Sequence, residues 1–235
     1  MIHLPLYGTN TLITINPSKI IAVGLNYREH VKESSVYDNK PMDVPAEPVL
    51  FAKTPNVLIA PGKSIVIPGH VREYNFSGER VDPECELAII IGKKGRHIPV
   101  DKAYDYVLGY TCFNDVSQRN IQKIDVSGWF RSKSFDTFGP IGPVVVSHKD
   151  IGDPQALNIT CRINGVIKQS GNTRDMIFSI KTLISFISRQ FTLEEGDIIA
   201  TGTPSGISPI VPGDIVEVEV EKIGILRNPV EAEKG

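Results

Sequence analysis

Long apolar runs are missing from this chain of 235 residues. The longest, such as residues 87–91, are far shorter than the roughly 20 apolar residues that a membrane-spanning helix needs. The N-terminus lacks a basic segment followed by an apolar stretch, so we expect no signal peptide. The sequence therefore predicts a protein without membrane spans and with a cytoplasmic location.

Cysteine is also scarce. The chain has three, Cys85, Cys112 and Cys161, and they are widely spaced and odd in number. A disulfide framework is not expected, and a reducing compartment fits this usage. No Cys-x-x-Cys pair or Cys/His cluster is present, which excludes the usual zinc-site patterns.

An excess of charge of one sign is the third absence. Lys and Arg total 25 against 27 Asp and Glu, a formal net charge of -2, and no basic stripe is visible. This balance argues against a nucleic-acid-binding protein. No Gly/Ser-rich linker or internal repeat divides the chain either, so we expect one catalytic domain over residues 1–235, with a short N-terminal strand region at 1–17.

Short strands separated by Pro and Gly dominate what is present. They are expected at residues 12–15, 20–23, 49–52, 64–67, 86–91, 107–113, 143–147, 196–200 and 213–218, with a hairpin of 157–163 and 166–169 around Asn164-Gly165. Apolar residues at helical spacing predict one long helix over about 173–189, capped by Asn172 or Thr173. Shorter helices are expected at 27–33 and 117–122. Residues 34–48 are polar with three prolines, which favours a mobile loop and a candidate lid.

Glu84 and Glu86 stand two residues apart at the start of an apolar strand, so their side chains point the same way. Two like charges on one face favour a cation between them, and Asp115, just after the strand at 107–113, could add a third ligand. Such a set of oxygens suits Mg²⁺ or Mn²⁺. The alternative is that the two glutamates simply flank a strand end that faces solvent.

His30 and Glu33 are neighbours at i, i+3 on the predicted helix at 27–33. A carboxylate beside an imidazole fixes its tautomer and raises its basicity, which would make a general-base pair beside the candidate lid. A surface salt bridge is the alternative.

Two further segments bear chemical groups. Lys133 lies in an apolar stretch fixed by Pro and Gly, residues 129–143, and needs an anionic partner there. Residues 201–206, Thr-Gly-Thr-Pro-Ser-Gly, could offer N–H groups and hydroxyls to a carboxylate. The latter segment lacks the Lys-Ser/Thr ending of a phosphate loop, so a nucleotide site is not predicted.

Five segments in order resemble the fumarylacetoacetate hydrolase family. The family's Gly-x-Asn-Tyr-x-x-His-x-x-Glu, Glu-x-Glu-Leu, Asn-Asp-x-Ser/Thr-x-Arg-x-x-Gln, Lys-Ser-Phe-Asp and Thr-Gly-Thr-Pro-x-Gly patterns stand here at residues 24–33, 84–87, 114–122, 133–136 and 201–206. The similarity spans about residues 18–230. It implies an α+β fold, a β-rich mixed-sheet roll with few helices, and a homodimer.

The resemblance also implies roles for individual residues. It makes Glu84, Glu86 and Asp115 the ligands of Mg²⁺ or Mn²⁺, with His30, Glu33 and Lys133 as catalytic residues. The substrate-binding residues that it implies are Arg119, Gln122 and Thr203.

The activity implied by the resemblance is metal-dependent cleavage of a C–C bond in a small 2-oxo acid through a pyruvate enolate. Acylpyruvate hydrolysis is the leading reaction, and oxaloacetate decarboxylation would pass through the same enolate. The alternative within the family is a 2-hydroxyhepta-2,4-diene-1,7-dioate isomerase or an oxaloacetate tautomerase. The alternative outside enzymes is a binding protein that retains the fold without catalysis.

Overall fold

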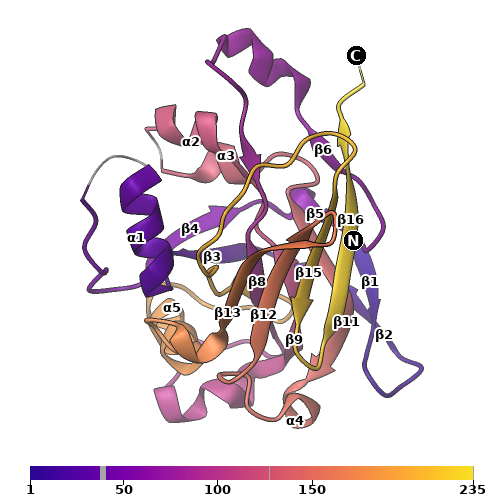
Figure 1. Ribbon diagram of the computed structural model, residues 1–235. Coiled ribbons are helices and arrows are strands. Elements are labelled where there is room, and N and C mark those ends of the chain that lie inside the picture. The colour runs from indigo at the N-terminus through magenta and orange to yellow at the C-terminus, as the bar shows by residue number, and fades with distance from the viewer. Residues whose placement is uncertain (38–40, 127, 235) are drawn as a thin grey trace.

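Two mixed β-sheets and a few short helices make up the computed structural model, which describes residues 1–37, 41–126 and 128–234 (Figure 1). The larger sheet has seven strands, in spatial order β4 (Val49–Lys53), β3 (Ile20–Gly24), β14 (Ile198–Ala200), β8 (Cys85–Ile91), β9 (Val107–Asn114), β11 (Gly139–Ser147) and β5 (Leu58–Ile59). The smaller has five, in the order β13 (Val166–Asn172), β12 (Asn158–Ile163), β15 (Ile215–Val220), β16 (Gly224–Ala232) and β6 (Ile65–Ile67).

The remaining elements are small. Strands β1 (Ile2–Pro5) and β2 (Leu12–Ile15) pair in the N-terminal region, and β7 (Val81–Asp82) pairs with β10 (Ser117–Gln118). The helices are α1 (Arg28–Tyr37), α2 (Arg119–Ile124), α3 (Phe130–Lys133), α4 (His148–Ile151) and α5 (Ile180–Gln190), with 3₁₀ turns at Pro55–Val57, Gly69–Tyr74, Val100–Tyr106 and Thr173–Asp175. The predicted fold class, α+β and rich in sheet with few helices, is confirmed.

Strand β8 lies at the centre of the larger sheet and is buried on both faces. Leu87, Ile89 and Ile91 point into the main core, to which the smaller sheet and α5 also contribute. Ala88 and Ile90 point the other way, into a second cluster that includes the apolar side chains of the N-terminal hairpin. Burial on both faces explains why this strand is a continuous apolar run rather than an alternating one.

The predicted helix over 173–189 is shorter than expected. Thr173–Asp175 forms only a 3₁₀ turn capped by Asn172, and α5 begins at Ile180, where the Ser179 side chain accepts the N–H of Thr182. Between them, the backbone N–H of Ile177 bonds to the Asn26 carbonyl, and the Asn26 side chain bonds to both the N–H and the C=O of Phe178. These bonds hold residues 177 and 178 beside the segment before α1, so a tertiary contact overrides the helical pattern.

Other boundaries differ as well. Helix α1 runs to Tyr37, so the candidate lid at 34–48 begins as helix, and its residues 38–40 lie outside the described part of the chain. Strand β16 is not among the predicted strands, and its sequence contains Pro229. That proline stands opposite Ile215 on β15, while the pairing with β6 starts only at Val230. Its missing N–H therefore falls outside the β6 ladder.

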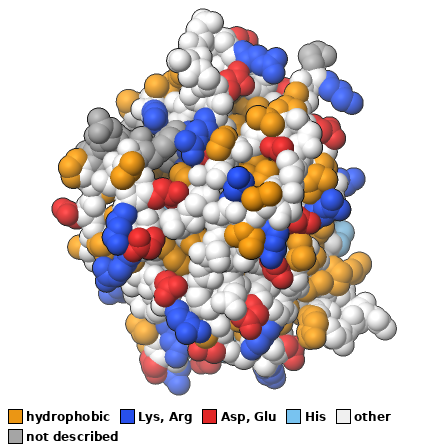
Figure 2. All heavy atoms as spheres, viewed as in Figure 1, with side chains coloured by type: hydrophobic (Ala, Val, Ile, Leu, Met, Phe, Trp, Pro, Cys, Tyr) orange, Lys and Arg blue, Asp and Glu red, His pale blue; other side chains and the backbone are white. Residues whose placement is uncertain are grey.

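The surface agrees with the balanced charge of the sequence. On the face shown in Figure 2, basic and acidic side chains are interspersed among apolar and neutral ones. Among the helices that the structure describes, none is long and apolar enough to cross a membrane.

Candidate metal centre and substrate cavity

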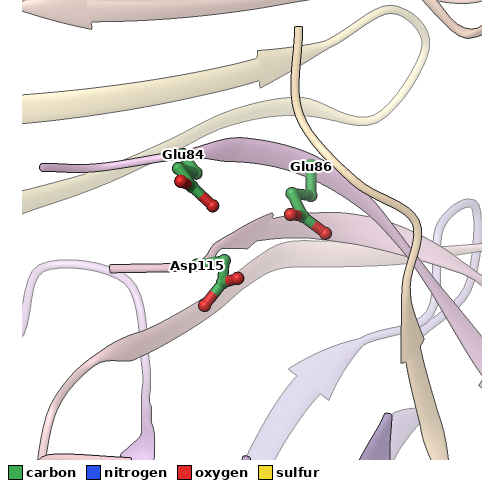
Figure 3. Close-up of side chains that lie close together, drawn as sticks. All are labelled: Glu84, Glu86 and Asp115. Atoms are coloured by element: carbon green, nitrogen blue, oxygen red, sulfur yellow. The ribbon is translucent and has the colours of Figure 1, made fainter. Parts of the chain in front are cut away.

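Three buried carboxylates meet where β8 and β9 lie side by side. Glu84 precedes β8, Glu86 is its second residue, and Asp115 follows β9. The Asp115 N–H donates to the Glu84 carbonyl at 2.9 Å, and the Asn114 side chain accepts the Glu84 N–H, so the two strand ends are fastened together. One oxygen from each carboxylate lies within 4.8 Å of the others, and Figure 3 shows the three groups converging. The alternative of a solvent-facing strand end does not hold.

Lys133 fills the need for an anionic partner that the sequence indicates. The residue ends α3, and its buried Nζ donates to Glu84 Oε2 and Asp115 Oδ2, both at 2.7 Å. The Nζ atom also lies 5.1 Å from the centre of the Phe51 ring. The ammonium group is therefore held between Glu84 and Asp115.

Arg119, the first residue of α2, contacts the same cluster from its other side. Its Nη2 donates to Glu84 Oε1 at 2.5 Å and its Nη1 to the Gln122 side-chain oxygen at 2.9 Å. Its Nε donates to Asp82 Oδ2 at 2.8 Å. The predicted pair Arg119 and Gln122 is thus brought together beside the carboxylates.

Three charged residues in or next to this cluster were not among the predicted site residues. Lys53, at the end of β4, donates from Nζ to Asp115 Oδ1 at 2.5 Å, and both side chains are buried. Asp82 on β7 bonds to Arg119 and also to Arg80, whose Nε lies 2.9 Å from Asp82 Oδ1. A lysine at the end of an apolar strand, as in Phe51-Ala52-Lys53, is a sequence signal that could have identified Lys53 as a candidate site residue.

Taken together, these contacts form a row of alternating charge in which every neighbouring pair is an ion pair. Its members, in order, are Arg80, Asp82, Arg119, Glu84, Lys133, Asp115 and Lys53. Glu86 stands beside this row. It accepts the Gly202 N–H at 2.9 Å on Oε2 and forms no ion pair with any residue that the structure describes.

The pKa shifts follow from these contacts. Burial alone would raise the pKa of Glu84, but Lys133 and Arg119 outweigh it and hold that pKa well below its usual value. For Glu86, burial and the charges of Asp115 and Glu84 act together and raise its pKa well above the usual value. Burial would lower the pKa of Lys133, but Asp115 and Glu84 raise it overall. The raised pKa of Lys133 favours its cationic form, whereas the raised pKa of Glu86 favours its protonated, neutral form while no cation lies beside it.

This arrangement fits a divalent metal ion. The ligand atoms are all carboxylate oxygens, the type that Mg²⁺ and Mn²⁺ prefer, and they lie close together in a buried site. A cation beside Glu86 would relieve the repulsion that raises its pKa. Glu84, Glu86 and Asp115 would hold such an ion.

His30 and Glu33 form a pair on α1, with His30 Nδ1 and Glu33 Oε2 3.0 Å apart. Glu33 Oε1 also accepts the Gly206 N–H at 2.9 Å, which fixes the carboxylate from the segment 201–206. His30 is buried rather than exposed, so the pair is not a surface salt bridge. One nitrogen of its ring is oriented by a carboxylate, as a general base requires.

Thr203 is buried beside the cluster, but its hydroxyl is engaged with the protein. The hydroxyl donates to the Cys85 carbonyl at 2.9 Å and accepts from the Gln169 side chain at 2.8 Å. To donate a hydrogen bond to a substrate it would have to turn away from Cys85.

A cavity of about 440 Å³ joins these groups. Of the predicted site residues, all but Glu33 and Asp115 line it: His30, Glu84, Glu86, Arg119, Gln122, Lys133 and Thr203. Its apolar wall includes Phe51 and Trp129, whose rings meet edge to face with centres 5.2 Å apart. A Cβ atom at Gly24 would lie 2.3 Å from the Trp129 ring, so glycine is needed there for this wall to form. Volumes of this size are typical of small-molecule sites.

Comparison with known proteins places the chain among enzymes. The family model described as fumarylacetoacetate (FAA) hydrolase C-terminal matches residues 19–231. An uncharacterised protein of Archaeoglobus fulgidus is 47% identical over 226 residues, which cover 96% of this chain and 84% of the relative. The mitochondrial oxaloacetate tautomerase of Rattus norvegicus is 41% identical over 221 residues, which cover 91% of this chain and 66% of the relative.

Solved structures agree with these sequence matches. A 5-carboxymethyl-2-hydroxymuconate delta-isomerase from Mycobacterium smegmatis is 38% identical with a TM-score of 0.81, over 94% of this chain and 81% of that one. Maleylpyruvate hydrolase from Sphingobium sp. SYK-6, in complex with manganese(II) and pyruvate, is 32% identical with a TM-score of 0.77, over 93% and 72%. Since both sequence and fold match over nearly the whole chain, it belongs to the fumarylacetoacetate hydrolase family.

Proposed function

We propose that this protein is a divalent-metal-dependent enzyme that cleaves a C–C bond in a 2-oxo acid, with acylpyruvate hydrolysis as its main reaction. The observation that carries the proposal is a single cavity with two chemically different walls. One wall holds the carboxylates Glu84 and Glu86 with Lys133, and another holds His30. Such a site can stabilise negative charge at one end of a substrate and move a proton at the other.

On the first wall, the residues would bind and orient the 2-oxo acid head. A divalent ion held by Glu84, Glu86 and Asp115 would supply Lewis-acid stabilisation of negative charge on the keto oxygen. Lys133 would add a positive charge from the protein itself, and Arg119 with Gln122 would hold the substrate carboxylate. Burial strengthens these contacts, because water screens them poorly there.

On the second wall, His30 would act as the general base. Glu33 holds its Nδ1, which leaves Nε2 to take a proton from a water that attacks the distal carbonyl of an acylpyruvate. Ser34 and Met42, both from the candidate lid at 34–48, line the same cavity. We propose that this segment covers the bound substrate and sets the length of acyl chain that the cavity accepts.

Oxaloacetate tautomerisation is the second candidate. It is favoured by the 41% identity to the mitochondrial oxaloacetate tautomerase of Rattus norvegicus. The same residues serve this reaction, since His30 could move a proton between carbon and oxygen, so that a C–H bond forms or breaks while every C–C bond stays intact.

An assay of the purified protein with Mg²⁺ or Mn²⁺ separates the candidates. Acetylpyruvate, oxaloacetate and 2-hydroxyhepta-2,4-diene-1,7-dioate would each be supplied, with released pyruvate and ultraviolet absorbance as readouts. Hydrolysis predicts pyruvate from acetylpyruvate. Interconversion of enol and keto oxaloacetate with no pyruvate from acetylpyruvate would reject the first candidate in favour of the second.

Substitutions test the assigned roles. Glu84→Gln and Asp115→Asn should each lower turnover by at least about 100-fold, because several kcal/mol of charge stabilisation are lost. His30→Ala should impair hydrolysis and leave metal binding intact. Glu194→Gln, at a partly exposed glutamate that pairs with Lys94, is the matched control and should retain activity. Full turnover in either ligand variant would refute the ligand assignment.

We also propose that the protein is a homodimer. Light scattering coupled to gel filtration should then give twice the 25.8 kDa mass of one chain. A mass of one chain at micromolar concentration would reject this.

A further inference from the structure

Each carboxylate of the triad has one oxygen that accepts from a donor other than Lys133. Asp115 Oδ1 accepts from Lys53 Nζ at 2.5 Å, Glu84 Oε1 from Arg119 Nη2 at 2.5 Å, and Glu86 Oε2 from the Gly202 N–H at 2.9 Å. The other oxygens of Glu84 and Asp115 both accept from Lys133 Nζ at 2.7 Å, and Lys133, unlike Lys53, lines the cavity. We call the oxygens that accept from Lys53, Arg119 and Gly202 the outer oxygens, and the remaining oxygen of each carboxylate the inner oxygen.

Among the three donors to the outer oxygens, Lys53 is the one for which the structure shows no role other than its bond to Asp115. Its side chain is fully buried, yet a lysine carries one of the largest costs of burial among side chains. Its described partners besides Asp115 are the Val116 carbonyl, at 3.3 Å, and the face of Phe113, at 6.0 Å. It does not line the cavity, so it does not reach a substrate there.

We infer that Lys53 is a positioning residue that restricts Asp115 to binding a metal ion through one oxygen, and that it thereby makes the centre selective against Ca²⁺. The inference rests on the proposed metal site. Mg²⁺ and Mn²⁺ are bound by single oxygens at short distances, whereas the larger Ca²⁺ takes more oxygens and readily accepts both from one carboxylate. With Oδ1 held by Lys53, Asp115 cannot offer its second oxygen.

Arg119 and Gly202 act on the other two carboxylates in the same sense, but they are poor tests. Arg119 is proposed to hold the substrate, and the bond from Gly202 comes from its backbone. Lys53 touches neither the cavity nor the substrate, so its substitution isolates the effect on Asp115.

The test measures the dissociation constants of Mn²⁺ and Ca²⁺ by calorimetry for the wild type and for Lys53→Met. Removal of a residue that orients a metal ligand commonly costs 10- to 100-fold in affinity. We expect the preference for Mn²⁺ over Ca²⁺ to fall by about 10-fold or more in Lys53→Met. The ratio is the informative quantity, since the loss of a positive charge affects both ions alike. Lys53→Arg, which keeps the charge and an N–H donor, should retain most of the preference.

Lys19→Met is the matched control, because Lys19 also pairs with a buried carboxylate, that of Asp197, outside the cluster. It should leave the ratio unchanged, and a ratio unchanged in Lys53→Met as well would overturn the inference. Should Lys53→Met not fold, a crystal structure of the wild type with Mn²⁺ decides the matter. Asp115 bound through Oδ2 alone supports the inference, and Asp115 bound through both oxygens rejects it. If the wild type binds neither ion, the proposed function fails together with this inference.

Discussion

The Arg119 side chain connects three other side chains of the site. Each of its three guanidinium nitrogens donates to a different partner, namely Asp82, Glu84 and Gln122. The planar guanidinium holds its N–H groups in fixed directions relative to one another. A partner that orients one N–H group therefore orients the others as well. Asp82 therefore contributes to the orientation of Arg119 although it does not line the cavity.

We expect Asp82→Asn to lower kcat/KM for the active 2-oxo acid by about 10-fold, mainly through a higher KM, because Arg119 loses a charged partner that orients it. Steady-state kinetics with saturating metal measures the effect. Arg80→Met removes the other, partly exposed partner of Asp82 and should leave the kinetics close to wild type. An equal loss in both variants would show that the charge of the row matters, and not the orientation of Arg119.

His148 is a residue whose charge state is linked to folding. Its ring packs against Tyr104 with centres 4.4 Å apart, and its Nδ1 lies 3.1 Å from the Tyr110 hydroxyl. Burial and the nearby Lys181 lower the pKa of His148, and Asp105 opposes them. The unfolded chain therefore binds a proton at this residue more readily than the folded protein does.

Stability should accordingly fall as the pH drops below about 6.5, the usual value for histidine, and through the lower pKa of the folded state. Urea denaturation between pH 8 and pH 5 would follow the free energy of unfolding, and His148→Gln should show a shallower decline than the wild type. Parallel curves for the two proteins would exclude a contribution from His148.

At the scale of elements, the start of α5 shows where sequence patterns mislead. Met176 and Ile177 continue the apolar spacing of the helix, but the Ile177 N–H bonds to the Asn26 carbonyl. The helix therefore begins only after its N-cap residue, Ser179. A local pattern contains no information about Asn26, which is far away in the sequence.

Ser179→Ala should destabilise the protein by about 1 kcal/mol, since the N-cap of α5 is lost. Asn172→Ala removes the cap of a 3₁₀ turn and two exposed side-chain bonds, to Asn158 and Arg174, and should cost less, although the sequence favours this position as the helix start. Urea denaturation of both variants gives the comparison. A larger loss for Asn172→Ala would contradict the assignment of the cap.

Elements with a local cause could be predicted from the sequence. The hairpin around Asn164-Gly165 follows from its turn residues, and β8 follows from its apolar run. Glu84 and Glu86 could be paired because strand geometry places them on one side. Lys53 and Asp82 could not, because their partners are distant in the sequence and only the fold brings them together. The helix predicted at 27–33 agrees with the start of α1 to within one residue, while the extension of α1 to Tyr37 depends on no signal that we identified.

On the scale of the whole molecule, metal binding and stability should be coupled. The proposed ligands lie at the start of β8 and just after β9, two neighbouring strands of the larger sheet, so only the folded chain presents them together. A ligand that binds only the folded state stabilises it by about 2.7 kcal/mol at 100 times its dissociation constant. Mn²⁺ should therefore raise the Tm in a concentration-dependent way, and EDTA should reverse the rise. Glu84→Gln should show no such shift, and an equal rise in this variant would place the ion elsewhere.

The charges of the row and of Glu86 balance one another. With Glu86, the members of the row number four cations and four carboxylates, which cancel when all eight are ionised. A divalent ion alone would leave a surplus of two positive charges in a buried site, and a 2-oxo acid substrate brings at least the negative charge of its carboxylate. Ion and substrate should therefore bind cooperatively, each increasing the affinity for the other by the same factor.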